Sequence, residues 1–104
     1  MNATDSIQEI SFEKLCMIVA PIAEKYGAER VYLFGSRARG DNRLDSDFDF
    51  FIALGRIRGL KLCGFWNELE NALGIEVDIV TEGAKLKDDF SQQVLRERKL
   101  VYES

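Results

Sequence analysis

The sequence predicts a small α/β (α+β) domain in which helices pack on one face of a short mixed sheet. Three observations support this fold class. Apolar residues recur at helical spacing in three segments, short runs rich in β-branched and aromatic residues separate them, and glycines mark the junctions. The 104 residues, 46% hydrophobic and 31% charged with a single proline, are typical of one globular domain, which we expect to span residues 1–104.

The first predicted elements are a helix and a strand. Between Ser11 and Tyr26 apolar residues lie three or four positions apart, as in an amphipathic helix. Ser11 is a suitable N-cap and Gly27 a suitable C-terminal stop. Pro21 should kink this helix or disturb its pairing locally. The apolar run Val31–Phe34 then indicates a buried strand.

The next predicted strand, Asp47–Leu54, has two unlike faces. Its alternation places Phe48, Phe50 and Ile52 on one face, and Asp47, Asp49 and Phe51 on the other. Apolar residues at helical spacing follow and end at Leu73, before Gly74, which predicts a second helix. Periodicity leaves open whether Phe51, Phe65 and Tyr102 belong to the core or to an interface.

Three further elements complete the chain. Ile75–Thr81 is predicted to be a third strand, and its alternation puts Asp78 on the face opposite its apolar neighbours. A last helix is expected from Leu86 to about Arg98, and Leu100–Tyr102 is expected to add a short edge strand.

Composition narrows the possible chemistry. The sequence contains no histidine, which removes histidine-dependent nucleophilic catalysis and nearly all catalytic zinc sites. It contains 18 acidic residues, so carboxylates acting with hard cations are the leading alternative. A net charge of −4 argues against direct binding of nucleic acid.

The sequence also carries expectations about the cellular location. No run of apolar residues is long enough to cross a membrane, and the first residues do not form a secretory signal. Cys16 and Cys63 lie far apart, each in an apolar pattern, and we expect both to be reduced core residues of a cytoplasmic protein.

The residues that indicate chemistry are two aspartates on one strand face. Asp47 and Asp49 lie one strand period apart, so their Cβ atoms are about 6–7 Å apart given a rise near 3.3 Å per residue. Asp78 repeats the pattern on the third strand, and it can complete a three-carboxylate site if that strand lies beside the second. Oxygen-only ligands suit Mg²⁺, with Mn²⁺ as a substitute.

A candidate phosphate site precedes the aspartates. Gly35 lets the backbone approach a phosphate, and Ser36 adds a hydroxyl beside amides that can bind an anion. Arg37, Arg39 and Arg43 place positive charge in the same connection, although each could instead pair with a surface acid. We regard Arg37 and Arg39 as the better candidates for phosphate binding.

The segment LFGSRARGDNRLDSDFDF resembles the core motif of the polymerase-β nucleotidyltransferase superfamily: Gly-Ser, ten residues, then Asp-x-Asp. The short length resembles the minimal nucleotidyltransferase (MNT) family, whose members pair with HEPN-domain toxins. The resemblance implies a nucleotidyltransferase fold, with Asp47 and Asp49 holding metal and triphosphate. It implies further that Asp78 completes the metal site and helps deprotonate the acceptor, while Gly35 and Ser36 hold the distal phosphates.

The same resemblance implies a reaction and a partner. MNT proteins of this kind resemble antitoxins that transfer AMP from ATP to a tyrosine of their HEPN toxin, in a hetero-oligomer. Two alternatives remain open: an antitoxin that acts only by binding, and a nucleotidyltransferase with a small-molecule acceptor.

Several polar or aromatic residues are expected to have no part in a site. Asp41 and Asp45 are interpreted as solvated loop acids, and Trp66 as a packing residue rather than a surface for base stacking. Glu70 and the run Arg96–Lys99 are interpreted as exposed helix surface.

Overall fold

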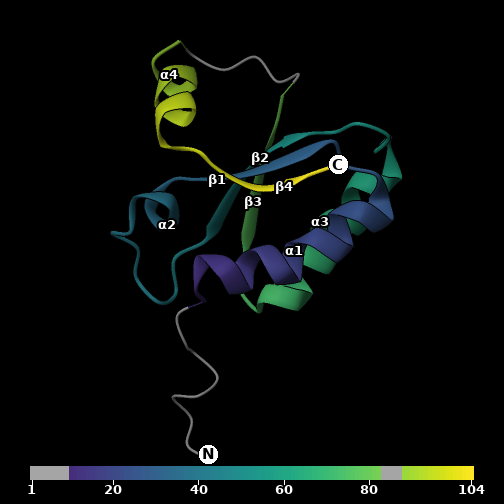
Figure 1. Ribbon diagram of the computed structural model, residues 1–104, viewed down its shortest axis with the longest axis horizontal. Coiled ribbons are helices and arrows are strands. Elements are labelled where there is room, and N and C mark those ends of the chain that lie inside the picture. The colour runs from purple at the N-terminus through teal and green to yellow at the C-terminus, as the bar shows by residue number, and fades with distance from the viewer. Residues whose placement is uncertain (1–9, 83–87) are drawn as a thin grey trace, which may run out of the picture.

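The computed structural model describes residues 10–82 and 88–104 (Figure 1). The predicted start of the last helix at Leu86 lies outside these residues. The elements in chain order are α1 (Phe12–Tyr26), β1 (Arg30–Phe34), α2 (Ser36–Arg39), β2 (Phe48–Ala53), α3 (Leu60–Leu73), β3 (Val77–Thr81), α4 (Asp88–Glu97) and β4 (Lys99–Glu103).

The four strands form one mixed sheet in the order β3-β2-β1-β4. β1 runs antiparallel to both β2 and β4, whereas β2 and β3 are parallel. The predicted mixed sheet and the edge position of the last strand are therefore confirmed. The register sets Asp49 opposite Asp78 on one side and opposite Phe34 on the other.

The main core lies between the sheet and the layer formed by α1 and α3. The three residues predicted to share one face of β2 have exposed fractions of 1% or less: Phe48, Phe50 and Ile52. They pack with buried residues of the two helices, among them Val19 and Phe65. Phe65 is thus a core residue, and Tyr102 packs partly buried against the same cluster.

The helix α4 covers the opposite face of the sheet, apart from α1 and α3 (Figure 1). Its Val94 packs with Phe34 and Phe51 in a second, smaller cluster of buried residues. Phe51 therefore belongs to a core as well. The predicted α/β class is confirmed, but the prediction that the helices pack on one face is wrong for α4, because its Val94 packs on the face that carries Phe51 and Asp49.

Local signals in the sequence produce the expected ends of α1 and α3. The Ser11 hydroxyl accepts a hydrogen bond from the Lys14 amide at 3.1 Å, and Gly27 and Gly74 end the two helices with φ of 83° and 73°. α1 continues through Pro21.

The two cysteines differ in their surroundings. Cys16 is half-buried and packs against the main core, whereas Cys63 lies exposed on α3, so the prediction of a core position for Cys63 is wrong. Cys63 follows the half-buried Leu62 by one position, and a step of one residue turns a helical side chain by about 100°, away from the buried face.

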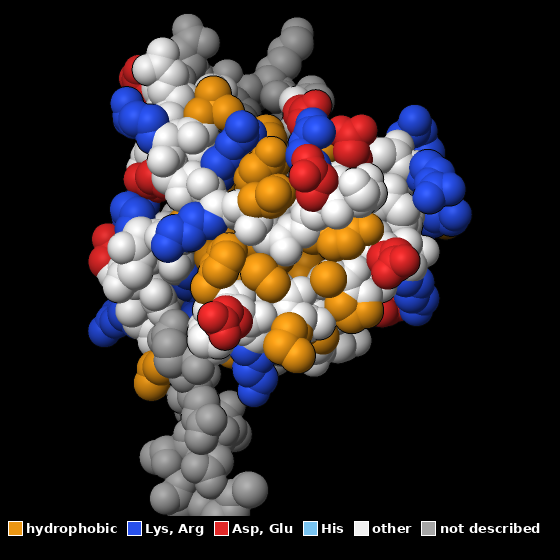
Figure 2. Space-filling model, in the orientation of Figure 1, with side chains coloured by type: hydrophobic (Ala, Val, Ile, Leu, Met, Phe, Trp, Pro, Cys, Tyr) orange, Lys and Arg blue, Asp and Glu red, His pale blue; other side chains and the backbone are white. Residues whose placement is uncertain are grey.

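The molecular surface mixes charges of both signs. Lysine, arginine, aspartate and glutamate side chains are interspersed around apolar ones on the face shown in Figure 2. Within the described ranges, no helix is both long and apolar enough to cross a membrane.

Candidate active site

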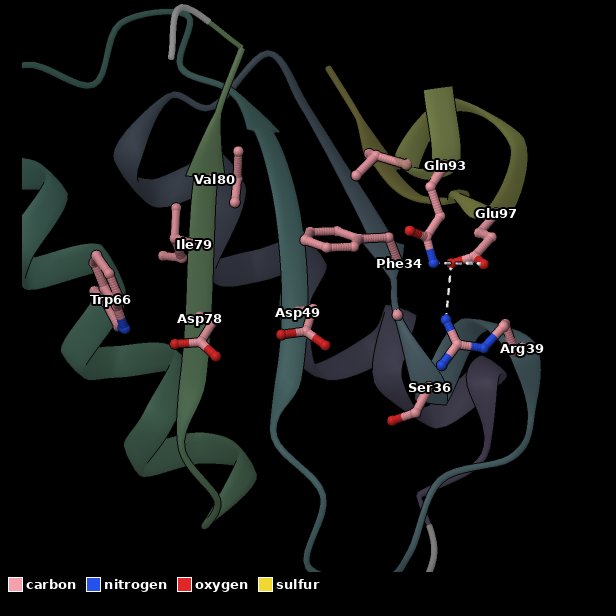
Figure 3. A pocket seen from close by; sticks show the side chains of 12 residues that line it. Phe34, Ser36, Arg39, Asp49, Trp66, Asp78, Ile79, Val80, Gln93 and Glu97 are labelled. Carbon is pink, nitrogen blue, oxygen red and sulfur yellow. Dashed lines mark hydrogen bonds and ion pairs between the residues drawn. The ribbon is translucent and has the colours of Figure 1, made fainter. Parts of the chain in front are cut away.

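A pocket of about 590 Å³ opens where β1, α2, β2, β3 and α4 meet (Figure 3). Its volume falls within the range of about 300–1,000 Å³ that is usual for small-molecule sites. One part is polar and the other is apolar. The described lining residues are Phe34, Gly35, Ser36, Arg39, Asp49, Trp66, Asp78, Ile79, Val80, Gln93, Val94 and Glu97.

Asp49 and Asp78 form the acidic part of this pocket. They are register partners on parallel strands, and their carboxyl groups lie side by side in Figure 3. Burial raises the pKa of the Asp49 carboxyl from 3.8 to about 6. The nearby charges of Asp78 and Asp47 and a hydrogen bond with Asp78 contribute to this raised pKa, because each favours the protonated form.

Asp47 lies just before β2 and is half-buried. It is near enough to raise the pKa of Asp49 through its charge, but it is not among the described residues that line the pocket. Among residues 10–82 and 88–104, no three acidic or cysteine side chains converge closely enough to form a complete metal site. The structure thus brings Asp49 and Asp78 together in the pocket, whereas Asp47 lies near Asp49 but outside the pocket lining.

The Asp49–Asp78 pair nevertheless suits a divalent cation. Both groups supply hard oxygen ligands, and a cation between them would offset the repulsion and desolvation that raise the Asp49 pKa.

Gly35 is fixed by its contact with Asp49. It follows β1 with φ of 76° and ψ of −157°, a combination that essentially only glycine adopts. A Cβ atom at this position would lie 2.3 Å from Oδ2 of Asp49. The glycine therefore permits the end of β1 and the Asp49 side chain to approach each other. This approach explains the glycine more specifically than the close backbone contact with phosphate that the sequence suggested.

Ser36 begins the short helix α2. The amides of Ala38 and Arg39 both donate to the Gly35 carbonyl at 3.1 Å, so the Ser36 amide occupies the first helical position, where an N–H has no partner within the helix. The Ser36 side chain lies at the pocket on the side away from Asp78 (Figure 3). This end of α2 provides polar groups suited to phosphate oxygens.

The arginines in this connection have different roles. Arg39 lines the pocket and forms ion pairs with Asp41 at 3.1 Å and with Glu97 of α4 at 3.0 Å (Figure 3). Arg37 instead donates to the carbonyls of Ser46 and Leu44 at 2.8–3.0 Å.

Arg37 is not among the described residues that line the pocket, and the phosphate-binding role predicted for it stays a prediction. Its guanidinium lies 4.0 Å from the ring centroid of Phe48, and together with the carbonyl contacts this holds the connection between α2 and β2 in place. Spacing along the sequence does not distinguish Arg37 from Arg39. The two side chains differ only in the side of the four-residue helix α2 from which they project. Arg43, Asp41 and Asp45 are exposed.

Sequence reasoning missed three residues at or beside the pocket. Trp66 packs against the main core, as predicted, but it also lines the pocket and donates from Nε1 to the Val77 carbonyl at 2.6 Å. Glu70 accepts from the Val77 amide at 3.0 Å, and Glu97 pairs with Arg39. The prediction that Glu70 and Glu97 lie on an exposed helix surface is thus wrong. The i, i+4 spacing of Trp66 and Glu70 indicates that both lie on one face of the helix, but it does not identify Val77 as their partner.

Comparison with known proteins identifies the class of protein that this fold and pocket define. The family model described as "Polymerase beta, Nucleotidyltransferase" matches residues 18–104. The chain belongs to this nucleotidyltransferase family.

Its relatives within the family are protein adenylyltransferases and minimal nucleotidyltransferases. A protein of Methanocaldococcus jannaschii, provisionally named a protein adenylyltransferase, is 39% identical over 61% of this chain and 69% of its own length. Protein adenylyltransferase MntA of Thermococcus cleftensis is 35% identical over 73% of this chain and 77% of its own.

Solved structures share the fold. One described provisionally as a minimal nucleotidyltransferase is 38% identical, with a TM-score of 0.72 over 88% of this chain and 97% of its own. The MNT antitoxin in a complex with a tri-AMPylated HEPN toxin of Shewanella oneidensis is 18% identical, with a TM-score of 0.66 over 90% and 74% of the two chains. At that identity the likeness shows the fold alone.

Proposed function

We propose that this protein transfers AMP from ATP to a tyrosine hydroxyl of a HEPN-domain partner and so acts as its antitoxin in a hetero-oligomer. The observation that carries the proposal is the pairing of Asp49 with Asp78 in one pocket with Gly35 and Ser36. The names of the relatives from M. jannaschii and T. cleftensis support protein adenylylation. A reaction that consumes ATP fits a cytoplasmic location.

In this proposal the polar part of the pocket holds the triphosphate. Ser36 and the first amides of α2 bind the distal phosphate oxygens, and Arg39 offsets their charge. The apolar part, which includes Trp66, Ile79 and Val80, takes the nucleoside. The pocket is large enough for a nucleotide.

The acidic pair serves the transfer itself. Asp49 and Asp78, with Asp47 at the margin, would hold Mg²⁺, which neutralises charge on the phosphates and lowers the barrier to displacement at phosphorus. The acceptor oxygen forms a bond to the α-phosphorus while the bond between the α-phosphorus and the oxygen that bridges to the β-phosphate breaks. Pyrophosphate leaves with the electron pair of the broken bond. The hydroxyl proton passes to Asp78, which the register keeps beside Asp49.

Incubation with labelled ATP, Mg²⁺ and a purified HEPN partner tests this function. We expect label from the α-phosphate, but not from the γ-phosphate, to appear on the partner, because AMP and not phosphate is transferred. Replacing the partner's tyrosines by phenylalanine should abolish labelling. Transfer of γ-label, or of no label at all, would contradict the proposal.

Matched variants distinguish the loss of a pocket carboxylate from the loss of any acidic side chain. Asp49→Asn and Asp78→Asn should each lower the labelling rate by roughly 10²-fold or more, whereas Asp45→Asn, which changes an exposed loop acid, should leave it within about twofold. If the variant with both Asp49→Asn and Asp78→Asn still neutralises the toxin at equal expression, the protein acts by binding alone.

A further inference from the structure

The strand that carries Asp78 lies at an open edge of the sheet. β3 has five residues and pairs only with β2, so no strand among the described residues covers its other side. The Phe48 amide donates to the Glu76 carbonyl at 3.0 Å, so the backbone of Glu76 faces β2. Because backbone polar groups alternate in direction along a strand, the N–H and C=O groups of Val77 face the open edge.

Two side chains of α3 bind both of these groups. Trp66 donates from Nε1 to the Val77 carbonyl at 2.6 Å, and Glu70 accepts from the Val77 amide through Oε2 at 3.0 Å. Trp66 and Glu70 are four residues apart and therefore share one face of the helix. Figure 3 shows Trp66 on the side of β3 that is turned away from Asp49.

The helix that presents this pair is itself firmly held. Phe65 and Leu69 of α3 are fully buried, and Leu73 is nearly so. Val77 has an exposed fraction of 2%, so its backbone groups are largely shielded from water, and their side-chain partners are needed in place of water. The two contacts thus transmit the position of a rigid helix to the first residue of a short strand.

We propose that Trp66 and Glu70 form a clamp on Val77 that positions Asp78 opposite Asp49 for the transfer reaction. Asp78 follows Val77 directly, so the clamp fixes the backbone one residue before the carboxylate. The clamp takes the place of a further strand, since an unclamped edge strand this short would fray from its first residue. Its catalytic consequence rests on the function proposed above, whereas its structural consequence does not.

Hydrogen exchange in the protein without nucleotide tests the clamp directly. Glu70→Met keeps the length of the side chain but removes the acceptor, and the Val77 amide should then exchange about tenfold faster or more. Glu70→Gln retains an acceptor oxygen and should restore slow exchange. Trp66→Phe removes the indole N–H but keeps an aromatic ring, and should also speed exchange. Unchanged exchange in both Glu70→Met and Trp66→Phe would overturn the clamp.

The matched control lies on the same helix. Glu68 of α3 accepts from Tyr26 and Lys25, so Glu68→Met breaks a comparable contact that leads to α1 instead of β3. This variant should leave Val77 exchange unchanged, within about threefold. If it accelerates Val77 exchange as much as Glu70→Met does, the effect is general loosening of α3 and the clamp is rejected.

Kinetics then test the positioning role. Glu70→Met should lower kcat for AMP transfer by about tenfold with KM for ATP within about twofold, because Asp78 is misplaced while the phosphate site is intact. Glu70→Gln should recover most of kcat, and Glu68→Met should retain it. An equal loss of kcat in Glu70→Met and Glu68→Met would overturn the positioning role. If the wild type transfers no AMP, the proposed function fails, and hydrogen exchange alone still decides the clamp.

Discussion

The close approach of Gly35 to Asp49 joins the acidic part of the pocket to the part proposed to bind phosphate. A Cβ at Gly35 would lie 2.3 Å from the Asp49 carboxylate, so a methyl group fits only if the strand or the carboxylate moves and disturbs the pairing of Phe34 with Asp49. A single methyl group therefore changes both parts at once. Gly40 offers a comparison, because it has φ of 86° but nothing within 4 Å of the place that a Cβ atom would take.

Gly35→Ala should be considerably more harmful than Gly40→Ala. The Gly40 variant is expected to lose only about 1 kcal/mol of unfolding free energy through backbone strain. The Gly35 variant adds the clash and a less accessible backbone conformation, and should lose about 2–3 kcal/mol or more, together with nucleotide binding. Urea denaturation and binding of a non-hydrolysable ATP analogue measure the two effects. Equal losses in the two variants would show that the contact with Asp49 is unimportant.

The raised pKa of Asp49 predicts a pH dependence of stability. The folded protein holds this proton up to about pH 6, whereas the unfolded chain releases it near 3.8. Ionisation of Asp49 therefore lowers the free energy of unfolding, by an amount that grows as pH rises from about 4 to 6 and is constant above that range. Asp49→Asn should raise Tm at pH 7.5, with a gain that shrinks to nothing near pH 4, when divalent cations are absent. Thermal unfolding between pH 4 and 8 measures it; a gain independent of pH would show that ionisation of Asp49 is not its cause.

At the scale of elements, the connection around α2 assigns distinct tasks to its two arginines. Arg37 binds loop carbonyls and lies over Phe48, which joins the connection to the main core. Arg39 faces the pocket and forms an ion pair with Glu97 of α4, so the helix that covers the second face of the sheet is linked to the proposed phosphate site.

Replacing each arginine by methionine should separate stability from binding. Arg37→Met removes hydrogen bonds and should cost about 1–2 kcal/mol of unfolding free energy with a small effect on ATP-analogue affinity. Arg39→Met breaks ion pairs of a side chain that is 40% exposed, so stability should change little while the affinity falls about tenfold. Denaturation and calorimetry report the two quantities, and the reverse pattern would refute the assignment.

At the scale of the whole molecule, the pocket joins segments from most of the chain. Ser36, Asp49, Asp78 and Val94 come from four elements, and the sheet order and α4 bring them together. A ligand in this pocket therefore contacts both hydrophobic clusters and should oppose unfolding of the entire domain.

Mg²⁺ with a non-hydrolysable ATP analogue should raise Tm of the wild type by several degrees, since a ligand at about 100 times Kd adds about 2.7 kcal/mol. Asp78→Asn should largely lose this shift, and chelation of Mg²⁺ should do the same to the wild type. Asp45→Asn should retain the full shift because its side chain lies in the exposed loop. A shift in Asp78→Asn as large as in the wild type would place the ligand elsewhere.

Much of this molecule was accessible from the sequence because its signals are local. Alternation along β2 placed Asp49 on the opposite face of the strand from Phe48 and Phe50. The capping residues of α1 and the C-terminal Gly74 of α3 marked where these helices end. The Gly-Ser and Asp-x-Asp spacing indicated the family, which the family model confirms. These features depend on bonded geometry and on the period of a single element, so neighbouring residues suffice to specify them.

The remaining features depend on where distant elements meet. Only the tertiary structure decided that Arg37 holds a loop while Arg39 faces the pocket. The same holds for the register that sets Asp49 opposite Asp78 and for the binding of Val77 by Trp66 and Glu70. The physical reason is that a side chain's partner is set by packing across the sheet and between layers. The sequence by itself determined which groups are available, and the fold determined which of them lie within a hydrogen bond of one another.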